Sequence, residues 1–430
     1  MHILLRRILL ISLVVFYAPT SRSELVIEIT KGVETAVPIA IVPFGWQGGA
    51  AGMPVNISSV VQADLKRSGL FKTLAERDMF TRPTEVAKVK FRNWKALGQE
   101  YLVIGQVNEV EGRYQVQFQV FDVYKGEQLL GYRLTVPAKD LRRAAHHVSD
   151  LVYQKLTGKK GVFSTRIAYV TSTALPNNKK NYKLLVADAD GFNPKTIASS
   201  FEPLMSPSWS PDGKKLAYVS FENKRAAIYI QMLATGKREK IAAYKGINGA
   251  PAFSPDGSRL ALTLSKDGSP DIYVLNLQNK LLMKVTKSYG IDTEPTWSPD
   301  GKTIVYTSDR GGKPQLYSIP SMGGQARRLT FAGDYNARGR FSPDGKSIAM
   351  VHANRGDYRI AVMDMATRTI NVLTAGRYDE SPSFSPNGDM ILYAARKGKR
   401  GVLSAVSIDG RMQQNLAFDS GEVREPAWSP

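Results

Sequence analysis

One phrase recurs along this chain at a nearly constant interval, and it constrains the fold more than any other feature. Each copy centres on a Ser-Pro pair, as in PSWSPDGKKLAYVS from Pro207 and PTWSPDGKTIVYTS from Pro295. The serines are Ser210, Ser254, Ser298, Ser342, Ser385 and Ser429, which lie 44, 44, 44, 43 and 44 residues apart. A period in the forties that contains several short strands is typical of a β-propeller, in which each repeat forms one blade.

Each repeat has the features of one four-stranded blade. An aromatic residue precedes every serine: Trp209, Phe253, Trp297, Phe341, Phe384 and Trp428. A large flat side chain at that point can fill the wedge between neighbouring blades. The Ser-Pro-Asp-Gly or Ser-Pro-Asn-Gly that follows predicts a tight turn, because proline suits its second position and glycine accepts a left-handed conformation. Three further runs of alternating apolar residues complete the predicted blade.

The last repeat stops after its first predicted strand, at Pro430. The segment RIAYVTS at 166–172 has the sequence of a second strand but no Ser-Pro turn before it. We therefore predict that the two segments pair within one blade. This pairing would close a six-bladed ring and leave no open sheet edge between its ends.

Residues 33–160 do not repeat and predict a small α/β domain ahead of the propeller at 161–430. VPIAIVPF at 37–44 predicts a buried strand, and ISSVVQADLKRSGLF predicts a helix that ends near Gly69. A second amphipathic helix, KDLRRAAHHVSDLVYQKLTG, ends at Gly158. The overall expectation is a multi-domain chain in which an α/β domain precedes an all-β propeller.

The N-terminus has the pattern of a secretory signal peptide at 1–23. Arg6 and Arg7 precede a short apolar run at 8–16, and small residues lead to Ser23. The apolar run is too short for a membrane span, which needs roughly 20 residues. The chain has no cysteine, so it has neither disulfides nor a cysteine that could carry an acyl anchor. We expect a soluble protein of the periplasm.

Residues 24–32, ELVIEITKG, would follow the cleavage point as an alternating arm. Such an arm can lie on its own protein or add a strand to the sheet of a partner. The alternative is an edge strand of the α/β domain.

The formal net charge of +20 favours an anionic partner or surface. Nucleic acid does not fit, because the chain carries an export signal and its basic residues are not interleaved with aromatics as in a single-strand groove. Membrane headgroups, acidic proteins, cell-wall polymer and plain solubility remain as explanations.

No motif in the sequence indicates catalysis. There is no GxSxG elbow, P-loop or HExxH, and the Asp-Gly pairs belong to the repeated turn. His146 and His147 are adjacent on a predicted helix, so they point to different sides and do not suggest a metal site. We expect no catalytic residue, no metal and no cofactor. The alternative is the propeller of a peptidase-like or lyase-like enzyme.

A propeller without catalytic groups usually binds a partner through one face. The residues before and at the start of each first strand should surround the mouth of the central channel. They are Asn248, Ala250, Asp292, Thr293, Glu294, Arg338, Asp379, Glu380, Ser381, Arg424 and Glu425. Both charge signs are present, which suits a folded protein partner. Ordinary solvated loops are the alternative.

Several motifs resemble the TolB family of the Tol–Pal system of Gram-negative bacteria. They are IAIVPFG at 39–45, FRNWKALG at 91–98, NGAPAFSPDG at 248–257, DTEPTWSPDG at 292–301, TSDRGGKPQLY at 307–317 and EPAWSP at 425–430. The combination of the α/β domain with the interrupted ring makes this resemblance specific.

The resemblance implies a non-enzymatic monomer that links two partners and supports outer-membrane integrity and constriction at cell division. A Pal-like peptidoglycan-associated lipoprotein would bind at the propeller mouth, where group A colicins would also bind. A TolA-like inner-membrane protein would bind the arm through Glu24, Leu25, Val26, Ile27, Glu28 and Ile29. We expect no nucleic acid partner and no membrane span.

Overall fold

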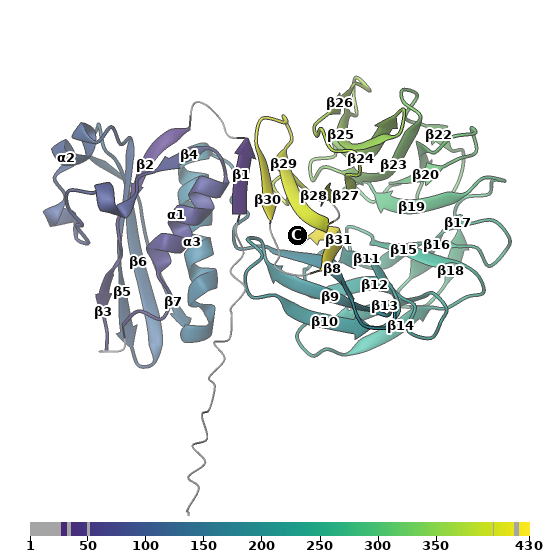
Figure 1. Cartoon of the computed structure of the whole chain (residues 1–430), viewed down its shortest axis with the longest axis horizontal. Coiled ribbons are helices and arrows are strands. Elements are labelled where there is room, and N and C mark those ends of the chain that lie inside the picture. Colours follow the sequence, from purple (N-terminus) through teal and green to yellow (C-terminus); the bar gives the residue numbers. More distant parts are fainter. Residues whose placement is uncertain (1–26, 32–35, 50–51, 399, 417–420) are drawn as a thin grey trace, which may run out of the picture.

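The computed structural model describes residues 27–31, 36–49, 52–398, 400–416 and 421–430. The predicted signal peptide and residues 24–26 of the arm lie outside the described residues. An α/β domain lies beside a propeller, and the strand β1 (Ile27–Lys31) lies between them (Figure 1). Within the described ranges, no helix combines the length and the apolar character that crossing a membrane requires.

The α/β domain is a mixed sheet in the order β4-β2-β5-β6-β7, with β3 paired to β5. Its strands are β2 (Val37–Ile41), β3 (Gly45–Gln47), β4 (Phe71–Thr73), β5 (Tyr101–Val110), β6 (Arg113–Asp122) and β7 (Glu127–Pro137). Its helices are α1 (Ile57–Arg67), α2 (Phe91–Ala96) and α3 (Leu141–Thr157), with 3-10 turns at Glu76–Asp78, Val86–Lys88 and Ala138–Asp140. Strand β2 runs parallel to β4 and β5, and the β5-β6-β7 pairs are antiparallel.

Alternation along β2 explains how this sheet is covered on both faces. Ile39 and Ile41 pack into a core with α1 and α3, whereas Ala40 and Val42 pack into a second core around Trp94 of α2. Side chains of successive strand residues point to opposite faces, so one buried strand serves two cores. Gly158, with φ of 75°, ends α3 as the sequence predicts.

The propeller has six blades, as predicted. Blade 1 contains β31 (Glu422–Trp428), β8 (Arg166–Ala174), β9 (Lys180–Asp188) and β10 (Lys195–Ser200). Blade 2 contains β11 (Leu204–Trp209), β12 (Lys215–Ser220), β13 (Ala227–Met232) and β14 (Arg238–Ala242). Blade 3 contains β15 (Asn248–Phe253), β16 (Arg259–Leu264), β17 (Asp271–Asn276) and β18 (Leu282–Lys284).

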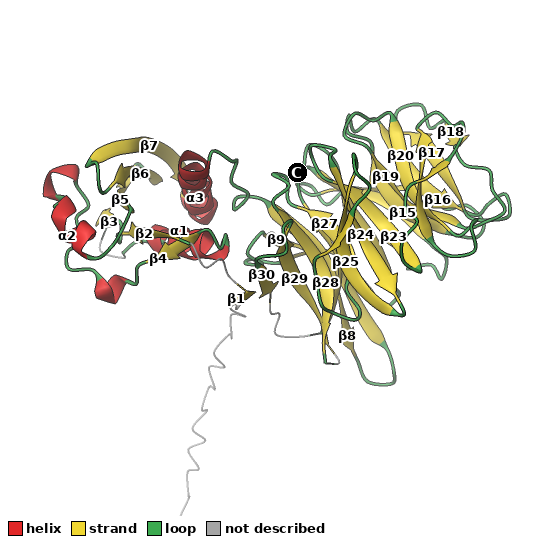
Figure 2. Cartoon of the chain, turned by 90° about the horizontal axis from the view of Figure 1, so that it is seen from above, coloured by secondary structure: helices red, strands yellow, loops and turns green. Residues whose placement is uncertain are grey.

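The last three blades repeat the same strand order, and Figure 2 shows the propeller turned by 90° from the view of Figure 1. Blade 4 contains β19 (Asp292–Trp297), β20 (Thr303–Ser308), β21 (Gln315–Pro320) and β22 (Arg327–Arg328). Blade 5 contains β23 (Tyr335–Phe341), β24 (Ser347–Asn354), β25 (Asp357–Asp364) and β26 (Ile370–Val372). Blade 6 contains β27 (Glu380–Phe384), β28 (Met390–Lys397), β29 (Arg400–Ser407) and β30 (Gln413–Leu416), with β1 added outside β30.

The ring closes within blade 1, where the last strand of the chain pairs with the segment at 166–172. This confirms the predicted pairing. Strand β31 pairs antiparallel with β8, and Trp428 lies opposite Ile167. Beyond the strand, Ser429 donates its backbone N–H to the carbonyl of Arg166 at 2.8 Å, and its Oγ accepts the N–H of Arg166 at 2.9 Å. The ends of the ring are therefore joined by a continuous ladder.

The interpretation of the arm as an edge strand of the α/β domain is wrong. Strand β1 instead pairs antiparallel with β30, where Ile27 lies opposite Leu416 and Lys31 opposite Gln413. The outer strand of a blade offers an unpaired row of backbone groups, and this edge of blade 6 is covered by the protein's own N-terminal segment. The arm thus lies on its own protein, one of the two arrangements that its pattern allowed.

Candidate functional site

The first strand of every blade carries one non-glycine residue in the left-handed conformation. These six residues, here called the inner ring, are Ser206, Ala250, Glu294, Arg338, Ser381 and Glu425, with φ of 51°, 45°, 56°, 55°, 55° and 50°. Each lies where the register between the first and second strands shifts, as between Thr293 and Thr296 in blade 4. The bulge turns the inner ring toward a channel cavity of about 290 Å³, which all six residues line. Such conformations are costly for residues with a side chain, and they gather at functional sites.

Three charged residues connect the inner ring across the channel. The Oε1 atom of Glu294 lies 2.7 Å from Nε of Arg338, and Nη2 of Arg338 lies 3.9 Å from Oε1 of Glu425. Oε2 of Glu294 accepts the hydroxyl of Thr307 at 3.0 Å and the backbone N–H of Arg338 at 3.2 Å. Burial acts to lower the pKa of Arg338, but Glu294 and Glu425 outweigh it and the pKa is raised. The guanidinium therefore stays charged and holds two carboxylates from other blades.

A second cavity, the mouth pocket, opens beside the channel and has a volume of about 460 Å³. Tyr335 and Tyr358 line it and pack edge to face with ring centroids 5.1 Å apart. The exposed Tyr378 adds a third aromatic ring, with the Arg396 guanidinium 5.8 Å from its centroid. The pocket thus combines aromatic surface with charges of both signs.

The structure brings most of the predicted mouth residues to these two cavities. Glu294, Arg338, Asp379, Glu380 and Arg424 line the mouth pocket. Ala250 and Glu425 line the channel with the rest of the inner ring. Thr293 is half-buried beside them, with its hydroxyl 3.3 Å from that of Thr263 in the neighbouring blade.

Three predicted mouth residues are buried, and their side chains bond to residues of nearby loops. The side chain of Asn248 bonds to backbone groups of Tyr244 at 2.7 and 2.8 Å. Asp292 is fully buried and forms an ion pair with Arg310 at 2.7 Å. Asp379 accepts the Thr374 hydroxyl at 2.5 Å. These residues would therefore affect a partner indirectly, by fixing the conformation of the loops that contact it.

Sequence reasoning missed two parts of the site. Ser206 completes the inner ring, and its interval of 44 residues to Ala250 matches the repeat. The second part, here called the aromatic rim, consists of exposed rings in the loops that lead into the first strands. The aromatic rim contains Phe201, Tyr244, Tyr289, Phe331 and Tyr378. One aromatic at this point in five successive repeats was the signal that could have identified it.

The α/β domain contacts the propeller at the face opposite the mouth. Lys159 forms an ion pair with Asp389 at 2.6 Å, and Asn387 donates to the carbonyl of Lys160 at 2.9 Å. Arg142 pairs with Asp190 at 2.5 Å. These propeller residues lie in or beside turns after first or third strands, and such turns lie opposite the mouth because successive strands are antiparallel. The mouth and the aromatic rim remain accessible.

The Asp-Gly pairs are turn residues, as predicted. Gly213, Gly257, Gly301 and Gly345 all have φ between 65° and 72°. In the second repeat, the hydroxyls of Ser254 and Ser258 donate to Asp256, which lowers the pKa of Asp256 to about 2. A carboxylate held in this way serves the turn and is a poor proton donor.

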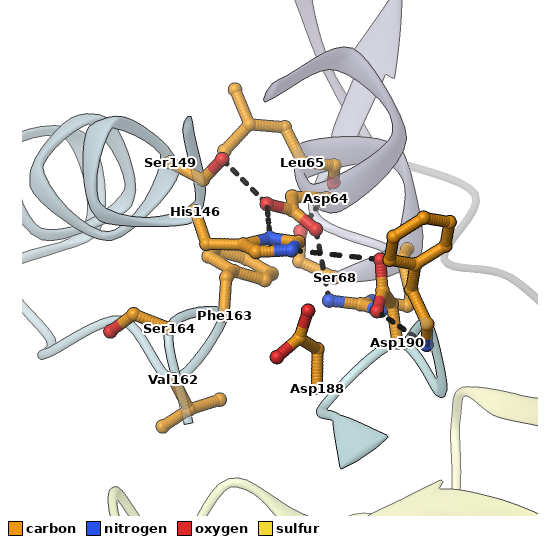
Figure 3. Close-up of polar contacts among 12 residues, drawn as sticks. Asp64, Leu65, Ser68, His146, Ser149, Val162, Phe163, Ser164, Asp188 and Asp190 are labelled. Atoms are coloured by element: carbon orange, nitrogen blue, oxygen red, sulfur yellow. Dashed lines mark hydrogen bonds and ion pairs between the residues drawn. The ribbon is translucent and has the colours of Figure 1, made fainter. Parts of the chain in front are cut away.

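A cluster between the domains brings Asp64, His146 and Asp190 within 4.8 Å of one another (Figure 3). Nδ1 of His146 lies 2.7 Å from Asp64, whereas Nε2 faces Asp190 at 3.7 Å. The carboxylates thus lie at opposite nitrogens of one ring, and Arg67 and Arg142 pair with them. This arrangement fits a charge network better than a metal centre, whose ligands converge on one point. His147 is exposed, as predicted for one of the pair, but His146 is fully buried.

Comparisons with known proteins agree over almost the whole chain. Two family models match it, the TolB amino-terminal domain over residues 25–129 and the TolB beta propeller domain over residues 153–430. The Tol-Pal system protein TolB of Nitrosococcus oceani is 62% identical over 414 residues, which cover 96% of this chain and 95% of that protein. The protein of the same name from Methylococcus capsulatus is 62% identical over 408 residues, 95% of each chain. The crystal structure of TolB from Acinetobacter baumannii has a TM-score of 0.87 and 46% identity, and the match covers 95% of this chain and 100% of that one.

Proposed function

The chain belongs to the TolB family, and from this premise we propose that it is a non-enzymatic, periplasmic protein-binding component of the Tol–Pal system. A Pal-like lipoprotein binds at the propeller mouth, and a TolA-like inner-membrane protein binds the N-terminal arm. By linking the two, the protein supports outer-membrane integrity and its constriction during division. Group A colicins compete for the same mouth.

The observation that carries this proposal is the composition of the mouth face. Tyr378 of the aromatic rim lines the mouth pocket with Arg338, Glu380, Arg396 and Arg424. The other rim residues lie in the corresponding loops on the same face, which the α/β domain leaves accessible. Aromatic and arginine side chains dominate the binding energy of protein interfaces. Complementary charges of both signs fix the orientation of a folded partner. A peptidase-like or lyase-like activity has no comparable support among the described residues.

The arm supports a second, separate contact. Strand β1 is held on β30 by main-chain pairing, and main-chain pairing is also how an extended segment adds to a partner's sheet. The same backbone groups cannot serve both sheets. Binding of the TolA-like partner therefore uses the outer edge of β1, or residues 24–26 ahead of it, or β1 after it has left β30.

A pull-down from a periplasmic extract tests the proposal, with the mature chain as bait and mass spectrometry to identify what is captured. We expect a Pal-like lipoprotein, and we expect Tyr289→Ala in the aromatic rim to reduce its capture. Leu281→Ala is the matched control, because Leu281 is also exposed on blade 3 but lies in the turn after the third strand, opposite the mouth. Equal loss in both variants, or turnover of peptides or sugars by the bait, would count against the proposal.

A further inference from the structure

A buried histidine stands between the two domains where α3 meets the propeller. His146 is 1% exposed, and each of its ring nitrogens faces a carboxylate (Figure 3). Nδ1 lies 2.7 Å from Oδ2 of Asp64 on α1, within the α/β domain. Nε2 faces Oδ2 of Asp190, in the turn after β9 of the propeller, at 3.7 Å. Among the described residues Nε2 has no hydrogen-bond partner. The contact of His146 with Asp190, which joins the two domains, is therefore not a full hydrogen bond.

The charged groups around His146 favour its protonated, positively charged form. The titratable groups around it are Asp64 and Arg67 from α1, Arg142 and Asp150 from α3, and Asp188 and Asp190 from the propeller. Four carboxyl groups therefore face two guanidinium groups. Burial raises the pKa of Asp150 and Asp188, whereas Arg67, His146 and Arg142 together overcome burial and lower the pKa of Asp190. Asp190 is thus kept as a carboxylate by the cations around it, of which Arg142 already pairs with it at 2.5 Å.

We propose that protonation of His146 controls how firmly the α/β domain docks on the propeller. As an imidazolium, His146 donates one N–H to Asp64 and presents the other to Asp190, so one cation holds a carboxylate from each domain. As a neutral imidazole hydrogen-bonded to Asp64, it turns the lone pair of Nε2 toward the Asp190 carboxylate, and the two repel each other. A shift of about 1 Å would bring Nε2 and Asp190 to a normal hydrogen-bond length.

The direction of the pH effect follows from where the two carboxylates lie. Burial lowers the pKa of His146, but Asp64 and then Asp190 outweigh it, so the pKa is raised above 6.5. Undocking removes Asp190, which raises the pKa of His146, and also relieves burial, which lowers it, while Asp64 stays in place. Because Nε2 faces Asp190 directly, we take the loss of this attraction as the larger change, so that the docked pKa exceeds the undocked one. The stabilisation of docking is therefore complete below the undocked pKa and is lost as the pH rises through the docked pKa. Docking weakens toward alkaline pH.

Because the chain has no cysteine, two engineered ones give a clean distance measurement. Lys125→Cys and Lys237→Cys place spin labels at exposed positions of the two domains. We expect electron–electron resonance to show one interdomain distance at about pH 5.5 and partial loss of that population at about pH 8.5. His146→Gln and Asp190→Asn should show the alkaline distribution at both pH values. His147→Gln, on the exposed neighbour, is the matched control and should behave as the unmodified chain.

An NMR titration of the histidines in the full-length chain provides the second readout. Asp190→Asn should lower the pKa of His146, because it removes the carboxylate that faces Nε2. If His146→Gln fails to fold, the pKa of His146 in Asp190→Asn decides, because that variant also removes the Arg142 ion pair and the interdomain distance alone would not separate the two contacts. The same distance distribution at both pH values, or a pH response that persists in Asp190→Asn, would overturn the proposal.

Discussion

Glu294 is the residue on which the charge network of the inner ring most depends. Glu294→Gln keeps an oxygen for the Thr307 hydroxyl but removes the charge that lies 2.7 Å from Arg338. We expect binding of the Pal-like lipoprotein to weaken by about 1–3 kcal/mol. The free energy of unfolding should also fall by about 1–3 kcal/mol, because Arg338 loses its nearest carboxylate. Titration calorimetry and thermal unfolding measure the two effects.

Glu239→Gln is the control for this variant, since Glu239 pairs with Lys280 at 2.8 Å on the exposed outer part of the propeller. It should leave both quantities nearly unchanged, as expected for a surface ion pair. Unaltered lipoprotein affinity in a folded Glu294→Gln protein would remove the inner ring from the binding site.

Asp292 should affect stability more than recognition. Its side chain is fully buried, pairs with Arg310 at 2.7 Å and accepts the Ser288 hydroxyl at 3.1 Å. Asp292→Ala leaves a partly buried guanidinium without its carboxylate, which we expect to cost about 3 kcal/mol of unfolding free energy. Urea denaturation gives this quantity, and an unchanged midpoint would contradict the structural role.

At the residue scale, the sequence predicts which positions reach the mouth but not how each side chain is used. The repeat aligns Asn248, Asp292 and Glu294 at the start of first strands. Whether a carboxylate at these positions faces the channel or bonds to a loop depends on the β-bulge in the first strand. The sequence does not show where this bulge lies, because non-glycine residues occupy it. The aromatic rim was missed because its five residues lie in loops of unequal length, so the alignment by the Ser-Pro pair does not bring them to one position.

At the scale of elements, β31 is the strand that closes the ring. The Trp428 indole donates to Thr165 at 2.8 Å and its backbone N–H donates to Ser383 at 2.9 Å, so this residue connects blade 1 to blade 6 and to the segment before β8. Removing residues 424–430 deletes this contact and leaves residues 166–170 of β8 unpaired on one side. Losing a fully buried aromatic costs about 3–5 kcal/mol, and half-buried Trp428 should contribute part of that, against about 5–15 kcal/mol for a whole domain.

Scanning calorimetry on the truncated chain measures this effect. We expect the propeller transition to move far down or to be replaced by aggregation through the exposed edge. The α/β domain should keep its own transition, because its two cores contain no residue of the blades. An unchanged high-temperature transition would mean that ring closure does not depend on β31.

Strand β1 should matter for a different partner. Deleting residues 24–32 should abolish binding of the TolA-like protein and leave lipoprotein binding unchanged or stronger, because the deletion affects the outer edge of blade 6 and spares the mouth. Surface plasmon resonance with each partner separates the two effects. Retained affinity for the TolA-like protein would place its site elsewhere.

The elements that the sequence predicts well are those built from local patterns. The blades, the turns and the stop of α3 at Gly158 follow from periodicity and from glycine and proline chemistry. The pairing of β31 with β8 was predictable because two incomplete repeats complement each other. The pairing of β1 with β30 could not be predicted. An open strand edge can pair with any extended segment, and neither sequence contains a pattern that specifies the other.

At the scale of the whole molecule, the two ends of the propeller channel have different neighbours. The α/β domain contacts turns after first and third strands, through Arg142, His146, Lys159 and Lys160. The loops after second and fourth strands form the mouth and carry the aromatic rim. The face with the turns after first and third strands is therefore in contact with the α/β domain, and the mouth face is accessible to a partner.

Hydrogen–deuterium exchange of the full chain, alone and with the soluble domain of a Pal-like lipoprotein, would show whether the partner binds at the propeller mouth. We expect protection in the loops at 243–247, 285–291, 329–334 and 373–379, which lead into the first strands at the mouth. Protection confined to the Ser-Pro turns or to the contact between the domains would contradict binding at the mouth, and so would the absence of any protection at saturating lipoprotein.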